Sequence, residues 1–121
     1  DEFLRFDSPL HLFERTATSD TEIGGVEIKA GQKIAALLGS ANRDESVFEN
    51  PDQLDLMRDP NPHIGFGAGI HFCIGAPLAR MEMTTSLPLL MEKFPNLQLA
   101  QEPVRRPTFV LRGYESVMVT S

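Results

Sequence analysis

The pattern of hydrophobic and polar positions divides the 121-residue chain into a short helical start, several strands, an irregular stretch, one long helix and a β-rich tail. Glu2, Leu4 and Arg5 are good helix formers, and this helix must end before Ser8-Pro9, because proline disfavours helix in the residue before it. Strand-like runs follow at residues 10–17, at 21–28 around a Gly24-Gly25 turn, and at 33–38. The last run fits either a helix or a strand, and the hairpin before it favours a strand.

Residues 42–62 show neither a helical nor a strand period. They carry turn chemistry instead, in Asn42-Arg43-Asp44, Asn50-Pro51-Asp52 and Asp59-Pro60-Asn61-Pro62. About 20 residues of irregular chain are unusual inside a compact domain, so this stretch predicts a functional loop.

A long helix is predicted after the Gly-rich stretch Gly65-Phe66-Gly67-Ala68-Gly69 and Cys73. Apolar residues then recur at steps of three and four and share one helix face: Ala76, Ala79, Met83, Leu87, Leu90 and Phe94. Pro77 suits the first turn, whereas Pro88 lies inside the helix and should bend it. The tail predicts strands at 96–100 and 109–120, around a turn at Arg112-Gly113.

Composition excludes several classes of protein. The net charge is −6 and no basic stripe is present, which argues against nucleic-acid binding. A single cysteine excludes a disulfide framework and paired-cysteine zinc spacing. The apolar stretches fall far short of the roughly 18 residues that a membrane span needs. The chain starts within a helical pattern and without Met, so we expect it to be a fragment.

Cys73 is the main candidate for chemistry, because it follows the Gly-rich stretch and directly precedes the long helix. A helix N-terminus stabilises an anion such as a thiolate. Gly67, Gly69 and Gly75 would let the backbone take positive φ values or approach a bulky group closely. Such a thiolate could act as a nucleophile or as a metal ligand, and the spacing to His71 is weak support for a nucleophile. A buried, inert cysteine is the plainer alternative.

The wider motif around Cys73 resembles the cysteine-ligand loop of the cytochrome P450 family. The matching residues are Phe66-x-x-Gly69-x-x-x-Cys73-x-Gly75 and the following Ala76-Pro77-Leu78-Ala79-Arg80-Met81-Glu82. Glu2-x-x-Arg5 with Ser8-Pro9 is similar to the family's Glu-x-x-Arg helix, and Asn42-Arg43-Asp44, Phe48, Pro51-Asp52 and Arg58 are similar to its meander. Glu45 and Leu54 depart from the family pattern, which often has Pro and Phe there. The residues around these motifs are most similar to those of soluble bacterial members of the family.

The resemblance implies an α+β fold: the C-terminal part of the mainly helical P450 fold. Its expected parts are the end of the Glu-x-x-Arg helix, a small β-sheet, the meander, the cysteine-ligand loop, a long proximal helix and a C-terminal β-hairpin. Residues 1–121 would then be an incomplete portion of a single domain that lacks the distal helix and the N-terminal part.

The resemblance also assigns the cofactor, haem b, and the residues that bind it. Cys73 would be the axial thiolate ligand of the haem iron, Phe66 would shield the sulfur, and Gly67, Gly69 and Gly75 would shape the loop. Arg15 and His63 would hold the haem propionates, as cationic and N–H donors suit carboxylates. His71 could lie near the proximal surface or be an ordinary solvated histidine.

Two further groups of residues follow from the resemblance. Glu2, Arg5 and Arg58 would form a buried charge cluster that ties the meander to the first helix, although spacing alone makes Glu2 and Arg5 a surface pair. Two apolar stretches would face a hydrophobic substrate or else be core strands; they include Leu12 and Phe13, and Val110 and Leu111.

The implied activity of the parent protein is that of a haem-thiolate monooxygenase: RH, dioxygen, two electrons and two protons give ROH and water. Ferredoxin and a ferredoxin reductase would supply the electrons, and the cytoplasm is the expected location. The alternatives are a haem-thiolate peroxygenase and a non-enzymatic haem-binding sensor. We expect the isolated fragment to be inactive and to lack a complete core, since conformational entropy of roughly 1–2 kcal/mol per residue must be offset by burial.

Overall fold

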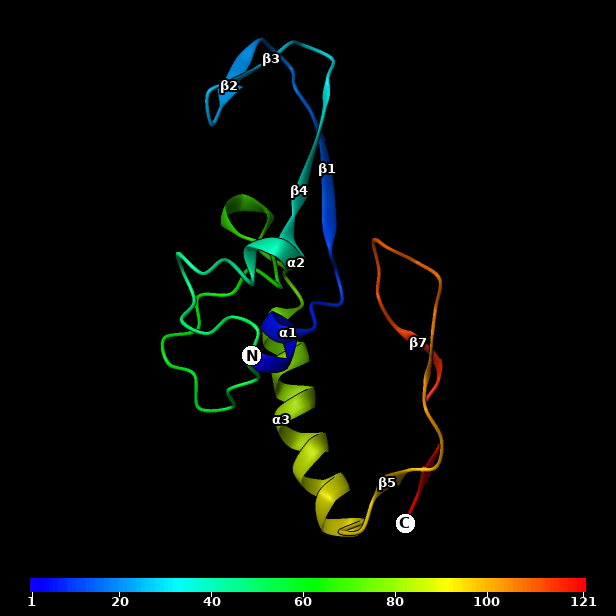
Figure 1. The fold of residues 1–121 in the computed structure, drawn as a ribbon. Helices are drawn as coiled ribbons and strands as arrows, with labels where there is room; N and C mark the ends of the chain where they lie inside the picture. Colours follow the sequence, from blue (N-terminus) through cyan, green and yellow to red (C-terminus); the bar gives the residue numbers. More distant parts are fainter.

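The computed structural model describes all residues from 1 to 121 and has an α+β fold, as predicted (Figure 1). The elements in chain order are α1 (Glu2–Phe6), β1 (Leu12–Thr16), β2 (Thr21–Ile23), β3 (Val26–Ile28), β4 (Lys33–Leu37), α2 (Leu38–Ala41), a 3-10 turn (Gly69–His71), α3 (Ala76–Lys93), β5 (Gln98–Leu99), β6 (Val104–Arg105), β7 (Tyr114–Ser116) and β8 (Val119–Thr120). None of the helices is long and apolar enough to cross a membrane.

The strands form four separate two-stranded antiparallel ladders: β1 with β4, β2 with β3, β5 with β8, and β6 with β7. In the longest ladder, Leu12 lies opposite Leu37 and Thr16 opposite Lys33. The predicted hairpin at 21–28 is confirmed, with Gly24 and Gly25 at φ of 59° and 80°, values that residues with a side chain rarely adopt. In Figure 1 this hairpin lies at the far end of the β1–β4 ladder.

The first half of the chain follows the predicted pattern with one difference. Helix α1 ends before Ser8-Pro9, and residues 42–62 contain neither helix nor strand. The predicted strand at 33–38 ends one residue early, because Leu38 begins the short helix α2 and is buried. Leu38 therefore packs into the interior from a helix rather than extending the ladder.

Helix α3 starts at Ala76 and continues through Pro88 to Lys93. The expectation of a single apolar face is wrong, because large apolar residues also lie on the other sides of the helix. Leu78, Met81, Leu89 and Met91 are each more than half exposed, and Leu87 on the predicted face is 42 % exposed. Apolar residues on several sides of a helix are typical of a helix that is covered on several sides.

The tail also differs from its prediction. The strands are β5 with β8 and, between them, β6 with β7, so one long, interrupted hairpin replaces the two predicted strands. Phe109 and Val110 lie in a bend, and Leu111 makes only an isolated bridge to Leu10. Proline at 107 and the β6 pairing move the turn to this segment, ahead of the predicted Arg112-Gly113.

The interior of the chain is small and largely polar. Seven residues are buried, and only Leu38, Phe48 and Ala76 among them are hydrophobic; the other four are Glu2, Arg5, Ser8 and Asn42. The accessible surface is 9179 Å², whereas a compact protein of 13.4 kDa exposes about 6,500 Å². Figure 1 shows the corresponding shape, with the ladder β1–β4, helix α3 and the tail extending away from the central region around α1 and α2.

This surface excess predicts that the 121-residue chain alone has no cooperative core. Hydrogen exchange of the purified chain should be fast for most amides, with slower exchange confined to the neighbourhood of Arg5 and Asn42. Heating should give a broad change in circular dichroism rather than a sharp transition. Strong protection across β5 to β8, together with one sharp thermal transition, would contradict the prediction.

Candidate haem-thiolate site

The loop that carries Cys73 folds back on itself between Phe66 and Gly75. The Cys73 amide donates a hydrogen bond to the Phe66 carbonyl at 2.8 Å, which closes the loop. Gly67 and Gly69 have φ of 76° and 59°, a region that favours glycine. A Cβ on Gly67 would also lie only 3.1 Å from the His71 carbonyl oxygen. The turn therefore requires glycine at position 67 for both its conformation and its space.

Cys73 is exposed and lies at the start of helix α3. Its flanking residues Ile70 and Ile74 are 97 % and 99 % exposed, although both are large and apolar. Gly75 has a φ of −83°, and a Cβ there would lie 3.7 Å from the Cys73 sulfur, at ordinary van der Waals distance, so its position beside the sulfur is the notable feature. The loop thus presents one soft ligand atom with apolar side chains beside it.

The loop that carries Cys73 suits a metal that is bound within a macrocyclic cofactor. No group of three or more His, Cys, Asp or Glu side chains is placed to hold a bare metal ion. Haem brings four nitrogen ligands of its own and needs one axial ligand from the protein, and a cysteine thiolate is one of the side chains that serve in this way. Its flat apolar ring would also contact exposed Ile70 and Ile74.

The guanidinium of Arg5 is completely buried, and all five of its N–H donors have partners. Two of them bind the Glu2 carboxylate side by side, at 2.7 and 2.8 Å. The other three donate to backbone carbonyls of Asn42 and Pro51, both at 2.8 Å, and of Gln53 at 3.1 Å. A buried charge with this complete set of partners avoids the large cost of an unpaired one.

The Glu2 carboxylate is equally well surrounded. Besides Arg5, it accepts hydrogen bonds from the Asp55 amide at 3.0 Å, the Asn61 side-chain amide at 3.1 Å and Nε of Arg58 at 3.3 Å. The hydrogen bonds from Arg5, opposed in part by burial, lower the pKa of Glu2 from 4.5 to about 2. Glu2 is therefore ionised at neutral pH.

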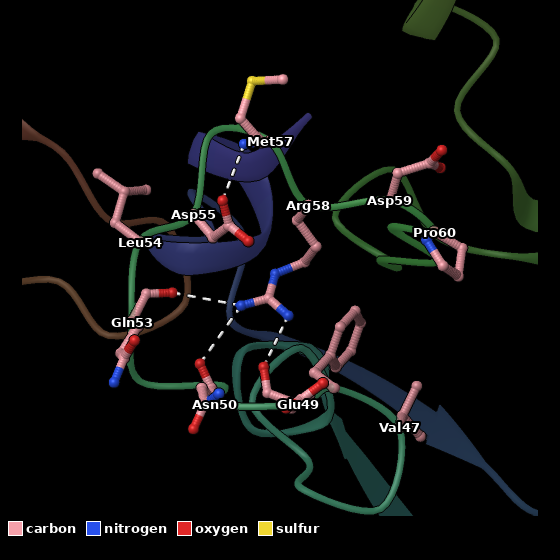
Figure 2. Close-up of a pocket in the computed structure, with 11 residues that line it drawn as sticks. Val47, Glu49, Asn50, Gln53, Leu54, Asp55, Met57, Arg58, Asp59 and Pro60 are labelled. Atoms are coloured by element: carbon pink, nitrogen blue, oxygen red, sulfur yellow. Dashed lines mark hydrogen bonds between the residues drawn. The ribbon is translucent and has the colours of Figure 1, made fainter.

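Arg58 brings the irregular segment around this pair. Its guanidinium donates to the carbonyls of Glu49 at 2.8 Å, Asn50 at 3.3 Å and Gln53 at 3.4 Å. Figure 2 shows these bonds at the wall of a cavity of about 650 Å³ formed by residues 47–60. The structure thus brings Glu2, Arg5 and Arg58 together, as the sequence analysis expected for the charge cluster.

A second charged group joins the two stretches that were expected to face a substrate. Asp7 lies 2.9 Å from both Arg105 and Arg112, and Nη1 of Arg112 lies 3.1 Å from Nε2 of His11. Burial lowers the pKa of His11, so its neutral ring can accept a hydrogen bond from Arg112. The His11 amide also donates to the Val110 carbonyl at 2.9 Å. Leu12 and Phe13 therefore lie next to the segment with Val110 and Leu111.

The two residues expected to hold propionates lie in different surroundings. Arg15 is exposed on β1, with its guanidinium 5.3 Å from the Phe13 ring centroid, and it donates to the Glu14 carbonyl. The side chain of His63 is only 3 % exposed and faces Asp1. No contact joins Arg15 to His63, and their role toward a propionate stays a prediction.

Comparison with known proteins decides the family. The cytochrome P450 family model matches residues 1–117. The chain belongs to the cytochrome P450 family. It is 45 % identical over 120 residues to a steroid C26-monooxygenase of Rhodococcus jostii and 45 % identical over 121 residues to the biotin biosynthesis cytochrome P450 of Bacillus subtilis. The two matches include 98 % and 99 % of this chain but only 26 % and 31 % of the length of the two relatives.

Solved P450 structures have the same fold over almost the whole chain. P450BioI in complex with hexadec-9Z-enoic acid ligated acyl carrier protein matches with a TM-score of 0.94 at 45 % identity, covering 98 % of this chain and 31 % of that one. A Bacillus megaterium P450 in complex with testosterone matches with a TM-score of 0.93 at 35 % identity, covering 98 % and 33 %. The separate ladders and the long interrupted tail hairpin are thus arranged as in the P450 fold.

Two residues next to the charge cluster of Glu2, Arg5 and Arg58 make contacts that the sequence did not predict. Asn42 is completely buried; its side chain donates to Ser8 and accepts from the Ile64 amide, both at 2.8 Å. The sequence placed Asn42 in a turn and in the meander motif but did not predict these partners. Phe48 is buried beneath the guanidiniums of Arg5 and Arg58, whose central carbons lie 5.3 and 6.0 Å from its ring centroid. The sequence named Phe48 as part of the meander motif, and what it did not predict is the packing of Phe48 against the two guanidiniums.

Substitution of Arg5 in the complete P450 should be severe. Arg5→Ala leaves the Glu2 carboxylate buried beside a single cation, at a cost of roughly 3–5 kcal/mol, and we expect haem-poor or insoluble protein. Arg5→Lys keeps the charge but offers three donors to a site that uses five, so its haem content should fall between those of wild type and Arg5→Ala. Soluble yield and haem per protein are the measurements.

The control for these variants is Lys33→Ala, which breaks an exposed ion pair with Glu14. Exposed ion pairs contribute little to stability, so this variant should keep normal yield and haem content. If Arg5→Ala behaved like Lys33→Ala, the buried cluster would not support the fold.

The low pKa of Glu2 predicts an acid-dependent loss of stability in the complete P450. Its folded pKa of about 2 lies below its ordinary value of 4.5, so the ion pair adds stability above pH 4.5 that disappears as the pH falls toward 2. The shift corresponds to a contribution on the order of 3 kcal/mol. The stability difference between wild type and Glu2→Gln should therefore be largest near pH 6 and shrink at pH 4 and pH 3 in urea unfolding.

Asp20→Asn is the matched control, because Asp20 is exposed and its pKa is lowered by surface hydrogen bonds to Ala30 and Lys29. Its stability difference from wild type should be small at each pH. A constant difference for Glu2→Gln across this range would show that Glu2 does not act through its charge.

Proposed function

We propose that this chain is the haem-thiolate part of a P450 monooxygenase and that residues 1–121 are the C-terminal portion of its single domain. The observation that carries the proposal is the exposed sulfur of Cys73, presented by a glycine-shaped loop at the start of α3 in a chain that matches the family over residues 1–117. The complete reaction would convert RH, dioxygen, two electrons and two protons to ROH and water.

Cys73 would hold the haem through its thiolate. Bound haem would supply the iron at which dioxygen is reduced and one oxygen atom is transferred to the substrate. Phe66 would limit the access of water to the sulfur, since its ring lies next to Phe72, with centroids 6.4 Å apart, and beneath the Arg80 guanidinium at 5.0 Å. Gly67, Gly69 and Gly75 would keep the loop narrow and the sulfur accessible to iron.

Arg15 is the proposed cation for a haem propionate. Its guanidinium is exposed at the edge of β1 and forms no ion pair, so its charge is available to an incoming carboxylate. His63 reaches a propionate only by leaving its buried position beside Asp1.

The proposed substrate is a hydrophobic small molecule. Leu12, Phe13, Val110 and Leu111 lie on two segments that are linked by the His11–Val110 hydrogen bond and the Leu10–Leu111 bridge. Leu111 is 64 % exposed, so its side chain is accessible to a bound molecule. The relatives named above act on or bind steroids and a fatty acyl chain, which are hydrophobic molecules. Ferredoxin and ferredoxin reductase are the proposed electron donors.

The ligand assignment predicts a spectroscopic signature in the complete protein. Reduced protein with carbon monoxide should show the strongly red-shifted Soret band of thiolate-ligated haem. Cys73→His should keep some haem but lose the red shift, because a neutral nitrogen ligand replaces the thiolate. The exposed neighbour gives the control: Ile74→Val should keep the shift. A red-shifted band in Cys73→His would mean that Cys73 is not the ligand.

A further inference from the structure

His63 has a set of contacts that propionate binding does not explain. The Gly65 amide donates a hydrogen bond to Nδ1 of His63 at 3.1 Å, so this nitrogen carries no proton. Burial lowers the pKa of His63, which favours a neutral ring with its proton on Nε2. Nε2 is buried without a well-aligned hydrogen bond and lies 3.3 Å from Oδ1 of Asp1.

The position beside Nε2 is already taken by a carboxylate. Asp1 lies there and accepts a hydrogen bond from Nε of Arg80 at 2.9 Å. A propionate at Nε2 would have to displace the Asp1 side chain from this position. The His63 side chain, at 3 % exposed, also offers no surface to an incoming group.

The backbone that His63 contacts leads directly to the ligand loop. A Cβ on Gly65 would lie 3.0 Å from Nδ1 of His63 and 3.1 Å from the Leu4 carbonyl, so the chain passes tightly between His63 and α1. The next residue, Phe66, accepts the Cys73 amide at 2.8 Å. Its ring centroid lies 6.1 Å from that of His63 and 5.0 Å from the Arg80 guanidinium. His63 and Arg80 thus both pack near the Phe66 ring.

We propose that His63 is a positioning residue for the thiolate ligand: its Nδ1 fixes the backbone of Gly65 and Phe66, and through the Phe66 carbonyl it sets where Cys73 lies. The proposal rests on Cys73 being the haem ligand. It replaces propionate binding as the role of His63. The ring must be neutral and carry its proton on Nε2, because only an unprotonated Nδ1 can accept from the Gly65 amide.

Two variants of the complete protein separate positioning from propionate binding. His63→Asn places a carbonyl oxygen near the position of Nδ1 and keeps the acceptor for Gly65, whereas His63→Leu removes it. His11→Leu is the control, because it deletes a half-buried histidine next to Arg112 rather than at the ligand loop. The readouts are haem per protein, the rate of haem transfer to apomyoglobin, and the fraction of the reduced carbon monoxide complex with the red-shifted band.

The positioning role predicts that His63→Leu still takes up haem but that its ratio of red-shifted to unshifted complex falls about fivefold, the effect of losing one neutral hydrogen bond. His63→Asn and His11→Leu should keep the wild-type ratio. Faster haem loss from both His63 variants, with an unchanged ratio, would establish propionate binding and overturn the proposal, as would an unchanged ratio and rate in both. Because wild-type protein must show the red shift first, failure of the ligand assignment is recognised separately.

A measurement on wild type keeps the proposal testable if His63→Leu does not fold. Nitrogen-15 shifts of labelled histidines in the diamagnetic carbon monoxide complex report the ring tautomer, with the His63→Asn spectrum giving the assignment. His63 should be neutral with its proton on Nε2. A proton on Nδ1 would exclude the hydrogen bond from Gly65 and overturn the proposal.

Discussion

The buried guanidinium of Arg5 is the constraint on which the rest of the structure depends. A guanidinium stays charged inside a protein, so each of its five donors needs an acceptor at a defined angle. Helix α1 supplies only the Glu2 carboxylate; the other acceptors are carbonyls of Asn42, Pro51 and Gln53. A segment without helix or strand therefore takes one conformation because its carbonyls must surround a single cation.

The same network extends to the loop that presents Cys73. Asn42 gives its carbonyl to Arg5, and its side-chain oxygen accepts the Ile64 amide, one residue before the Gly65 amide that binds His63. Phe66 then accepts the Cys73 amide. Between the charged pair and Cys73, each of these hydrogen bonds involves a backbone group, in a stretch that contains no α-helix and no strand. Positioning of the sulfur thus depends on polar groups with few alternative partners, not on the packing of apolar side chains.

The parts of this arrangement that sequence could predict are those set by local chemistry. The Gly24-Gly25 pair specifies its hairpin, and Pro77 lies in the first turn of α3. The family spacing identifies Cys73 and the charged residues Glu2, Arg5 and Arg58. The acceptors of Arg5 could not be predicted, because a backbone carbonyl has no sequence signature. The same holds for the side chain of His63, whose neighbours Asp1 and Arg80 are distant in sequence. The error about α3 has another cause: the search for a helical period detected one apolar face, while Leu78, Met81 and Leu89 lie among polar residues on the other sides and do not belong to that repeat.

The buried polar residues around Arg5 and the exposed apolar surface have complementary roles in stability and specificity. A buried ion pair often contributes little net stability compared with apolar residues of the same volume, but breaking it is costly, so it selects one arrangement over others. Stability must then come from apolar burial, and in this chain Ile70, Ile74, most of α3 and the tail strands still expose their apolar side chains. The relatives are three to four times longer than the matched region, and haem and the further chain of such a protein would cover those surfaces. If Cys73 is the haem ligand, the hydrogen bonds of Arg5 and Asn42 would help to fix the ligand loop before haem binds, and bound haem would add the apolar burial that this chain lacks.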